Sequence, residues 1–295
     1  MEPIFYINRQ TGEKKEEKVY GETVLRFLYG NCFGKFLSHL ISRIPFFSWL
    51  YGYLQTRPSS QKKIVPFIKK FKVDPSEFLL SPDTFSSFND FFIRKLKPES
   101  RPLSKQPAIV PADGRYFFYQ NIHEAQGFVV KGQKFDLATL LDNELLAYDY
   151  AHGTMVMARL CPTDYHRFHF PCDCVPGETK LINGWLYSVN PMAVKRDVTI
   201  FTQNKRTLCE LHTEGFGKVL FLEIGATFVG SIHQTYTPGK AYKKGDEKGY
   251  FSFGASSLIL LFPHDKLQLD QDLISLSSQQ IEVKCLMGQS LGTLK

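Results

Sequence analysis

The stretch GYFSFGASSLILLFP, residues 249–263, places two adjacent serines directly before a run of bulky apolar residues. The run at 258–262 is short, continuously apolar and closed by Pro263, a pattern typical of a buried β-strand. A serine can act as a nucleophile when a base lies beside it. Ser256 and Ser257 are therefore candidate functional residues at the mouth of a buried strand.

The residues around these serines do not match the usual serine-hydrolase elbow. That elbow is a G-x-S-x-G turn between a strand and a helix, whereas Gly254 and Ala255 precede a strand-like run here. A strained turn that exposes the peptide bond between Ala255 and Ser256 to the serine's own hydroxyl is the better interpretation.

Short apolar or alternating runs continue through the chain from Ile109 onward, separated by Gly, Pro, Asn and Asp. They predict a β-rich body of short mixed or antiparallel strands, barrel- or sandwich-like, and therefore an α+β fold. One helix is expected over residues 136–150. The strand-like runs lie at 115–122, 127–135, 154–160, 180–189, 197–204, 218–232, 256–262 and 279–287.

Residues 21–72 are both basic and amphipathic. Nine Lys and Arg residues are opposed there by one acidic residue, Glu22. Apolar residues recur at spacings of three and four between Leu25 and Ile44, which is the period of one helix face, and Pro45 should end or bend that helix. Two interpretations remain open: the helices pack on the protein's own core, or they lie as interfacial helices on an anionic membrane.

Nucleic acid is a weaker candidate partner, because the helix face at residues 25–44 carries too many apolar side chains for a simple phosphate-binding arm. We therefore divide the chain into a helical, membrane-associating region at 1–80 and a β-rich catalytic domain at 81–295.

The overall composition is that of a folded protein, with 295 residues of which 43% are hydrophobic and 22% charged. Its 6 cysteines are too sparse for a disulfide-stapled scaffold, and the N-terminus lacks the apolar core of a signal peptide. The sequence contains no run of about 20 uncharged apolar residues, so we do not expect a transmembrane helix. These features favour a reducing, cytoplasmic setting.

The densest polar cluster is RLCPTDYHRFHFPCDCVPGE, residues 159–178. The surrounding aromatic side chains can shield His166 and His169 from water and move their pKa values toward those of a general base. A zinc site formed by His166, His169, Cys172 and Cys174 is an alternative, although the Cys-x-Cys spacing is unusually tight. A third possibility is that the two histidines only fill a polar niche.

Asp113 lies in PADGRY, residues 111–116. The Asp-Gly pair is a common turn signature and needs no functional explanation by itself. Asp113 gains a role only if a histidine needs orienting, since a carboxylate can fix the tautomer of an imidazole and stabilise its protonated form.

With these pieces placed, the chain from about Phe88 to its C-terminus resembles the phosphatidylserine decarboxylases, a pyruvoyl-dependent enzyme family. Each motif alone is weak, but their order and spacing together are specific. The motifs are FNDFFIRKLKPESRP, PADGR, KGQKF, DYHRFH, LYSVNP, EIGATFVGSI, KGDEKGYFSFGASS and VKCLMGQSLG.

The resemblance implies a proenzyme that cuts itself between Ala255 and Ser256. Ser256 would then become a covalent pyruvoyl group at the start of a small chain, 256–295, which stays with the large chain, 1–255, as a heterodimer that can dimerise further. By the same resemblance, Asp113, His169 and Ser256 form the self-processing triad, and His166 lies near the pyruvoyl group and assists decarboxylation.

The activity implied is conversion of phosphatidylserine to phosphatidylethanolamine and CO2 through a Schiff base with the pyruvoyl group. The substrate would lie in an anionic membrane, with the enzyme peripheral on the cytoplasmic face of a bacterial cell membrane. Two alternatives are a pyruvoyl decarboxylase of a soluble amino acid and a zinc-dependent or inactive lipid-binding module of the same fold.

One residue departs from the family's pattern. The family commonly has Gly directly before the reactive serine, where this chain has Ala255. If the turn requires a positive φ at that position, the Cβ costs about 1 kcal/mol or more and slows the cut.

Overall fold

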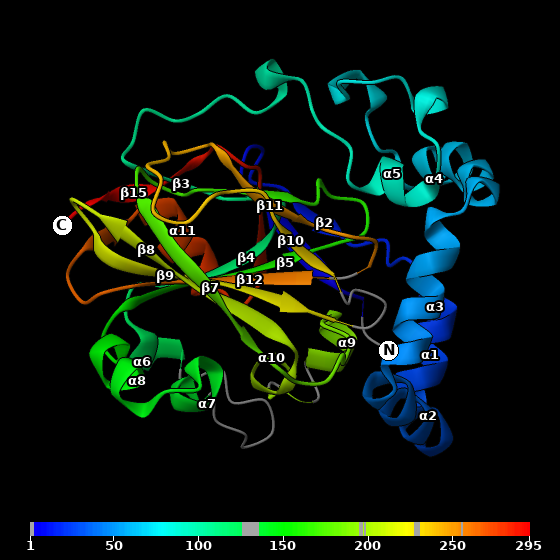
Figure 1. Cartoon of the computed structure of the whole chain (residues 1–295), viewed down its shortest axis with the longest axis horizontal. Coiled ribbons are helices and arrows are strands. Elements are labelled where there is room, and N and C mark those ends of the chain that lie inside the picture. The colour runs from blue at the N-terminus through cyan, green and yellow to red at the C-terminus, as the bar shows by residue number, and fades with distance from the viewer. Residues whose placement is uncertain (1–2, 126–135, 195–196, 198, 227–230, 255) are drawn as a thin grey trace.

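A computed structural model describes residues 3–125, 136–194, 197, 199–226, 231–254 and 256–295, and it has the expected α+β fold (Figure 1). Its centre is a nine-stranded sheet within these residues. In spatial order the strands are β2 (Lys14–Glu16), β1 (Phe5–Asn8), β14 (Glu282–Cys285), β4 (Gly114–Tyr119), β5 (Thr154–Leu160), β12 (Ser256–Phe262), β9 (Gly217–Gly225), β8 (Arg206–Thr213) and β7 (Val175–Ile182).

Strand β12 contains the apolar run at 258–262, and it lies inside the sheet with antiparallel partners on both sides. Every one of its residues is buried. Because side chains alternate along a strand, Leu258 and Leu260 join one core while Ile259 and Leu261 join the other. The continuous apolar run therefore reflects a strand that is covered on both faces.

Two three-stranded sheets contribute to the core on the Leu258 side of the large sheet. The large sheet is open, with β2 and β7 as its edges, so the sandwich-like form of the expected body is the one observed. The small sheets consist of β10 (Ile232–Gln234), β11 (Glu247–Phe251) and β6 (Arg167–His169), and of β13 (Leu267–Leu269), β15 (Ser290–Leu294) and β3 (Ala108–Ile109).

Short helices contribute most of the cover on the other face, where Leu140, Leu141 and Phe201 join Ile259 and Leu261 in the second core. The helix expected over 136–150 is divided in two because Asp142 takes a left-handed φ of 52°. The helices of the body are α6 (Ile122–Ala125), α7 (Leu137–Leu141), α8 (Glu144–Tyr150), α9 (Pro191–Val194), α10 (Ile200–Gln203) and α11 (Gln271–Ser277), the last of which packs on β4 and β14.

The expectation of a strand at 197–204 is wrong, because residues 200–203 form the helix α10. Its β-branched residues favour a strand locally, but α10 closes with a hydrogen bond from the Asn204 N–H to the Ile200 carbonyl and packs on α7. The strand expected at 127–135 lies outside the described residues.

The N-terminal helices form an extension along one side of the body, seen at the right of Figure 1. We call α1 to α4 the helical arm: α1 (Glu22–Gly30), α2 (Cys32–Arg43), α3 (Pro45–Thr56) and α4 (Ile64–Phe71). As expected, the helix stops before Pro45, which begins the next one. Within the described part of the chain, no helix is both long and apolar enough to cross a membrane.

The prediction of a helical region at 1–80 is incomplete, because this region also contains two strands. Strand β1 pairs in parallel with β14, and β2 pairs with β1, so the first residues belong to the large sheet. Helix α5 (Phe88–Phe92) packs against α3, and their shared aromatic core includes Phe67, Phe91 and Phe253. The domain boundary near residue 80 stays a prediction.

Candidate active site

Ser256 is the first residue of β12, at the place where the chain crosses from a small sheet to the large one. Strand β11 ends at Phe251, whose N–H donates to the His166 carbonyl, and β12 begins five residues later. Ser256 pairs with Leu160 on one side and Gly225 on the other. Its Oγ is buried and has no hydrogen-bond partner among the described residues.

Ser257 is equally buried and its Oγ also lacks a partner in the described part of the chain. Strand alternation places it on the face of Ile259 and Leu261, opposite to Ser256. Ser256 shares its face with Leu258, whose core contains Phe168 of β6 and Phe251 of β11. The sheet that carries His169 therefore packs on the Ser256 side.

Among the described residues of the turn before Ser256, one has a backbone that favours glycine. Gly254 has a φ of 142°, which an L-residue with a Cβ adopts only under strain. Ala255, the residue expected on the other side of the cut, lies outside the described residues.

His166 is fully buried and its ring packs on Phe92, with the ring centroids 3.8 Å apart. Its Nδ1 donates to the Asp164 carbonyl at 3.0 Å, so Nε2 carries the lone pair, and no described residue bonds to it. Burial lowers the pKa of His166 to about 3. The imidazole is consequently neutral at physiological pH.

His169 ends β6 and is held through both ring nitrogens. Its Nδ1 donates to the Gly245 carbonyl at 2.8 Å, and Tyr165 Oη lies 3.2 Å from its Nε2 and donates to it. Burial lowers the pKa of His169 and raises that of Tyr165. The arrangement is a neutral imidazole whose basic nitrogen faces a phenol.

Asp113 directly precedes β4, and its carboxylate is held by other partners than the expected histidine. Arg101 donates from Nε to Oδ1 at 2.9 Å and from Nη2 to Oδ2 at 2.6 Å, and the Met287 N–H donates to Oδ1 at 2.9 Å. The His169 N–H bonds to the Pro111 carbonyl, which brings the two segments side by side.

The structure therefore gathers Ser256, His166, His169 and Asp113 around one edge of the sheet sandwich without linking them directly. No hydrogen bond joins Asp113 to His169, or His169 to Ser256, among the described contacts. The catalytic roles of these residues stay predictions. Arg101 and the Met287 N–H hold Asp113 in place, and Tyr165 and the Gly245 carbonyl hold His169.

The zinc ligands considered above are not assembled into a site. The described residues contain no group of three or more His, Cys, Asp or Glu side chains placed to hold a metal ion. Cys172 and Cys174 are buried, and burial raises the pKa of both thiols.

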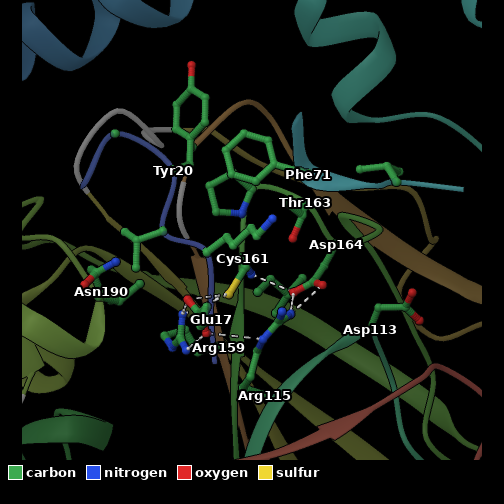
Figure 2. Close-up of a pocket in the computed structure, with 18 of the residues that line it drawn as sticks. Glu17, Tyr20, Phe71, Asp113, Arg115, Arg159, Cys161, Thr163, Asp164 and Asn190 are labelled. Carbon is green, nitrogen blue, oxygen red and sulfur yellow. Dashed lines mark hydrogen bonds and ion pairs between the residues drawn. The ribbon is translucent and has the colours of Figure 1, made fainter. Parts of the chain in front are cut away.

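A cavity of about 880 Å³ opens beside this site, between the body and the helical arm. Asp113, Tyr165 and Gly254 line it from the body, and Leu28 and Phe71 line it from the arm. Figure 2 shows Glu17 between Arg159 and Arg115 in its wall, with Asp164 on the far side of Arg115. The cavity therefore joins an apolar wall to a charged one.

Three further residues of this site are not evident as functional from the sequence: Arg94, Arg101 and Tyr165. All three lie inside family motifs, in FNDFFIRKLKPESRP and DYHRFH. The available signal for Arg94 was a basic residue close behind an aromatic pair, in Phe91-Phe92-Ile93-Arg94. Arg94 also contacts Thr163 and Asp164, about 70 residues further along the chain, and that contact could not be deduced from the sequence.

Comparison with known proteins agrees with the motifs. The family model for phosphatidylserine decarboxylase matches residues 88–293. A phosphatidylserine decarboxylase proenzyme of Chlamydia caviae is 50% identical over 294 residues, covering 99% of this chain and 98% of that protein. The corresponding proenzymes of Chlamydia pneumoniae and Fusobacterium nucleatum are 49% and 45% identical, covering 97% and 100% of this chain and 96% and 99% of theirs. The chain therefore belongs to the phosphatidylserine decarboxylase family.

Proposed function

We propose that this chain is a self-processing proenzyme whose mature form decarboxylates phosphatidylserine to phosphatidylethanolamine. The observation that carries the proposal is the buried, unpartnered Ser256 hydroxyl at the start of the central strand, in a chain that matches its relatives over nearly its full length. A buried hydroxyl without a partner is unfavourable for stability, which is consistent with a chemical task.

Self-processing begins at the peptide bond between Ala255 and Ser256. Ser256 Oγ attacks the Ala255 carbonyl carbon, the C–N bond breaks and the released nitrogen takes the proton, giving an ester. Loss of the Ser256 Cα proton then breaks the Cβ–O bond and releases Ala255 as a carboxylate. Water adds to the remaining dehydroalanine and ammonia leaves, so residue 256 ends as a pyruvoyl group.

His169 is the general base in this proposal, because Nδ1–H is fixed on Gly245 and the lone pair is on Nε2. Its Nε2 would accept the Ser256 hydroxyl proton once the hydrogen bond from Tyr165 Oη to that nitrogen is broken. Asp113, fixed by Arg101, contributes a nearby negative charge that favours the imidazolium. Strand alternation supports Ser256 over Ser257 as the nucleophile, since Ser256 is on the side of the β6 sheet.

The residues around Ser256 fit a pyruvoyl group. Conversion of Ser256 breaks no hydrogen bond to a described residue, since its hydroxyl has none, and the nearby His166 offers an unpartnered nitrogen. The group supplies a carbonyl that accepts the electron pair left when CO2 departs. His166 is neutral with a free lone pair, so its Nε2 can take a proton from water and donate it to the carbon that lost CO2.

A lipid substrate is supported by the surface of the helical arm. Large apolar side chains are exposed there, including Phe33 and Phe36 at 67% each and Trp49 at 61%. Residues 21–72, which contain the arm, also carry the nine basic residues identified in the sequence. Exposed aromatic residues next to Lys and Arg are typical of a protein that lies on an anionic membrane, and we place the enzyme on the cytoplasmic face of a bacterial cell membrane.

The test is intact-mass spectrometry of the purified protein with its decarboxylase activity on phosphatidylserine. We expect two chains, 1–255 and a pyruvoyl-blocked 256–295, and release of CO2 from phosphatidylserine but not from free serine. Ser256→Ala should stay uncut, whereas the matched Ser257→Ala should still be cut. An uncut chain with full activity would remove the proposal.

A further inference from the structure

We propose that Arg94 binds the phosphodiester of the lipid headgroup and so determines that the substrate is a phospholipid. This inference rests on the proposed function and adds to it a specific contact. Its basis is a buried guanidinium in the cavity wall that has no counter-ion contact among the described residues.

Arg94 follows α5 and is buried, with 4% of its surface exposed. Its guanidinium donates only to backbone carbonyls: Nη1 to Phe91 at 3.4 Å, and Nη2 to Thr163 at 3.2 Å and to Asp164 at 3.3 Å. Nε is buried and has no partner in the described part of the chain. A buried charge held this way keeps much of its desolvation penalty, which an incoming anion would relieve.

The carboxylates nearest to Arg94 are engaged by other arginines. Arg101 binds both Asp113 and Glu77, and Arg115 binds Asp164. Arg94 forms no ion pair with any described residue, and burial lowers its pKa to about 10. It therefore stays protonated at neutral pH as a cation that is available to an external anion.

Arg94 also lines the cavity that opens beside the proposed reactive residue. It lines the same cavity as Gly254, which is two residues from Ser256. The Asp164 carbonyl accepts hydrogen bonds from both Arg94 Nη2 and His166 Nδ1. A headgroup whose amine reaches residue 256 would consequently bring its phosphate, only a few covalent bonds away, toward Arg94.

The chemistry favours the phosphate over the substrate carboxylate as the partner. A cation on the carboxylate would stabilise the ground state, whose charge is lost as CO2 leaves, and would raise the barrier. The phosphate keeps its charge throughout the reaction, so a contact with it stabilises substrate and transition state alike. Loss of such a contact raises KM with little change in kcat.

Arg206 provides a matched control within the same chain. It is a buried arginine that also donates only to backbone carbonyls, those of Leu140, Thr139, Thr202 and Asn204. It uses all three nitrogens for these bonds and is absent from the wall of the cavity beside Ser256. Its role is structural, so its replacement should affect stability but not substrate affinity.

The experiment compares mature wild type, Arg94→Gln and Arg206→Gln. Short-chain phosphatidylglycerol, which has the phosphodiester but neither amine nor carboxylate, is titrated by calorimetry, and KM and kcat are measured on phosphatidylserine. We expect both Arg variants to be cut normally and Arg94→Gln to lose about tenfold to a hundredfold in affinity for the probe, as for a charge-assisted hydrogen bond. KM should rise similarly, while Arg206→Gln keeps wild-type values.

Unchanged affinity for phosphatidylglycerol in Arg94→Gln would overturn the inference, as would a rise in KM without loss of probe binding, which indicates a carboxylate contact. No binding of the probe to the wild type would also overturn it. If Arg94→Gln does not fold, Arg94→Lys replaces it, and a loss of a few-fold is expected because the charge stays and the planar fork is lost. Failure of the wild type itself to decarboxylate phosphatidylserine would instead overturn the proposed function.

Discussion

His166 shows how burial can be the main influence on the charge of a catalytic candidate. Its ring lies between Phe92 and the backbone of the 164–166 turn, where water is excluded. The charged form is penalised there, so the pKa falls to about 3. A neutral imidazole with an unpartnered Nε2 is, in our proposal, the group that relays a proton to the carbon that lost CO2.

The same shift predicts acid sensitivity of the fold. Between about pH 3 and pH 6.5 the unfolded chain binds a proton on residue 166 that the folded chain does not, so stability rises with pH in this window and is lost on acidification. The slope should be about 1.4 kcal/mol per pH unit for this group. The test compares the single variant Ser256→Ala with the double variant that also carries His166→Gln, by denaturant unfolding at pH 7 and pH 5. The free energy of unfolding should depend less on pH in the double variant.

His169 contributes in the same direction, so some pH dependence should persist after this change. If the free energy of unfolding changed equally with pH in the single and the double variant, the burial argument would be contradicted.

Gly254 allows a second prediction about a single residue. Its φ of 142° lies where a Cβ causes strain, so Gly254→Ala should cost about 1 kcal/mol or more and slow the appearance of the 256–295 fragment. Gly52 lies in α3, where an added Cβ would meet no heavy atom within 4 Å, and Gly52→Ala should stabilise the helix slightly without changing the cut. A wild-type cleavage rate in Gly254→Ala would show that the turn tolerates a side chain.

At the level of elements, the small sheet that carries His169 is fixed to the large sheet by a buried ion pair. Lys248 of β11 donates to Glu223 of β9 and to Gln234 of β10, and neither member of the pair is exposed to solvent. The rings of Phe221 and Tyr236 lie 4.9 Å from the Lys248 Nζ. Register places Glu223 opposite Leu258, two residues from Ser256, so this contact helps to hold the two sheets together at the site.

Breaking this pair on one side should be severe. Lys248→Met leaves the Glu223 carboxylate buried without its partner and is expected to cost about 3–5 kcal/mol, seen as a lower Tm. Lys248→Met with Glu223→Gln removes both charges and should recover part of the loss. The exposed pair of Lys180 and Asp142 is the control, since Lys180→Met should change stability by less than about 1 kcal/mol. A double variant no more stable than Lys248→Met would contradict this account.

In the whole molecule, the helical arm has two surfaces with different tasks. Leu28 and Tyr29 pack into the second core of the body, and Ile64 and Phe67 pack with the aromatic cluster around Phe253. The opposite surface leaves large apolar side chains in contact with solvent. Both interpretations of the amphipathic pattern therefore apply, each to one surface: core packing for the first, and by our proposal membrane contact for the second.

The exposed surface predicts vesicle binding. Phe33→Ser with Phe36→Ser should reduce binding to vesicles containing phosphatidylserine by about tenfold or more, because each buried Phe is worth about 1.5–3 kcal/mol. Stability should hardly change, as both side chains are 67% exposed. Leu145 and Tyr148 on α8 are exposed at 81% and 83%, and their replacement by Ser should leave sedimentation with vesicles unaltered. If the arm double variant and the α8 double variant bound vesicles equally well, the arm would have only a structural role.

Local sequence was enough to identify several parts of this protein. The strand at 256–262, the helix break at Pro45 and the basic, apolar character of the arm all follow from patterns within a few residues. The candidate residues Ser256, His166, His169 and Asp113 were found through motifs, and the structure places them at one edge of the sheet sandwich.

Only the tertiary structure decided how distant segments meet. It placed β12 between β5 and β9, put Ser256 and Ser257 on opposite faces, added β1 and β2 to the sheet and made Arg101 the partner of Asp113. It also turned the segment at 200–203 into a helix and left Arg94 without a counter-ion among the described residues. Periodicity and backbone preference act over a few neighbouring residues, whereas strand order, facing and ion pairing depend on packing between segments that lie far apart in the chain.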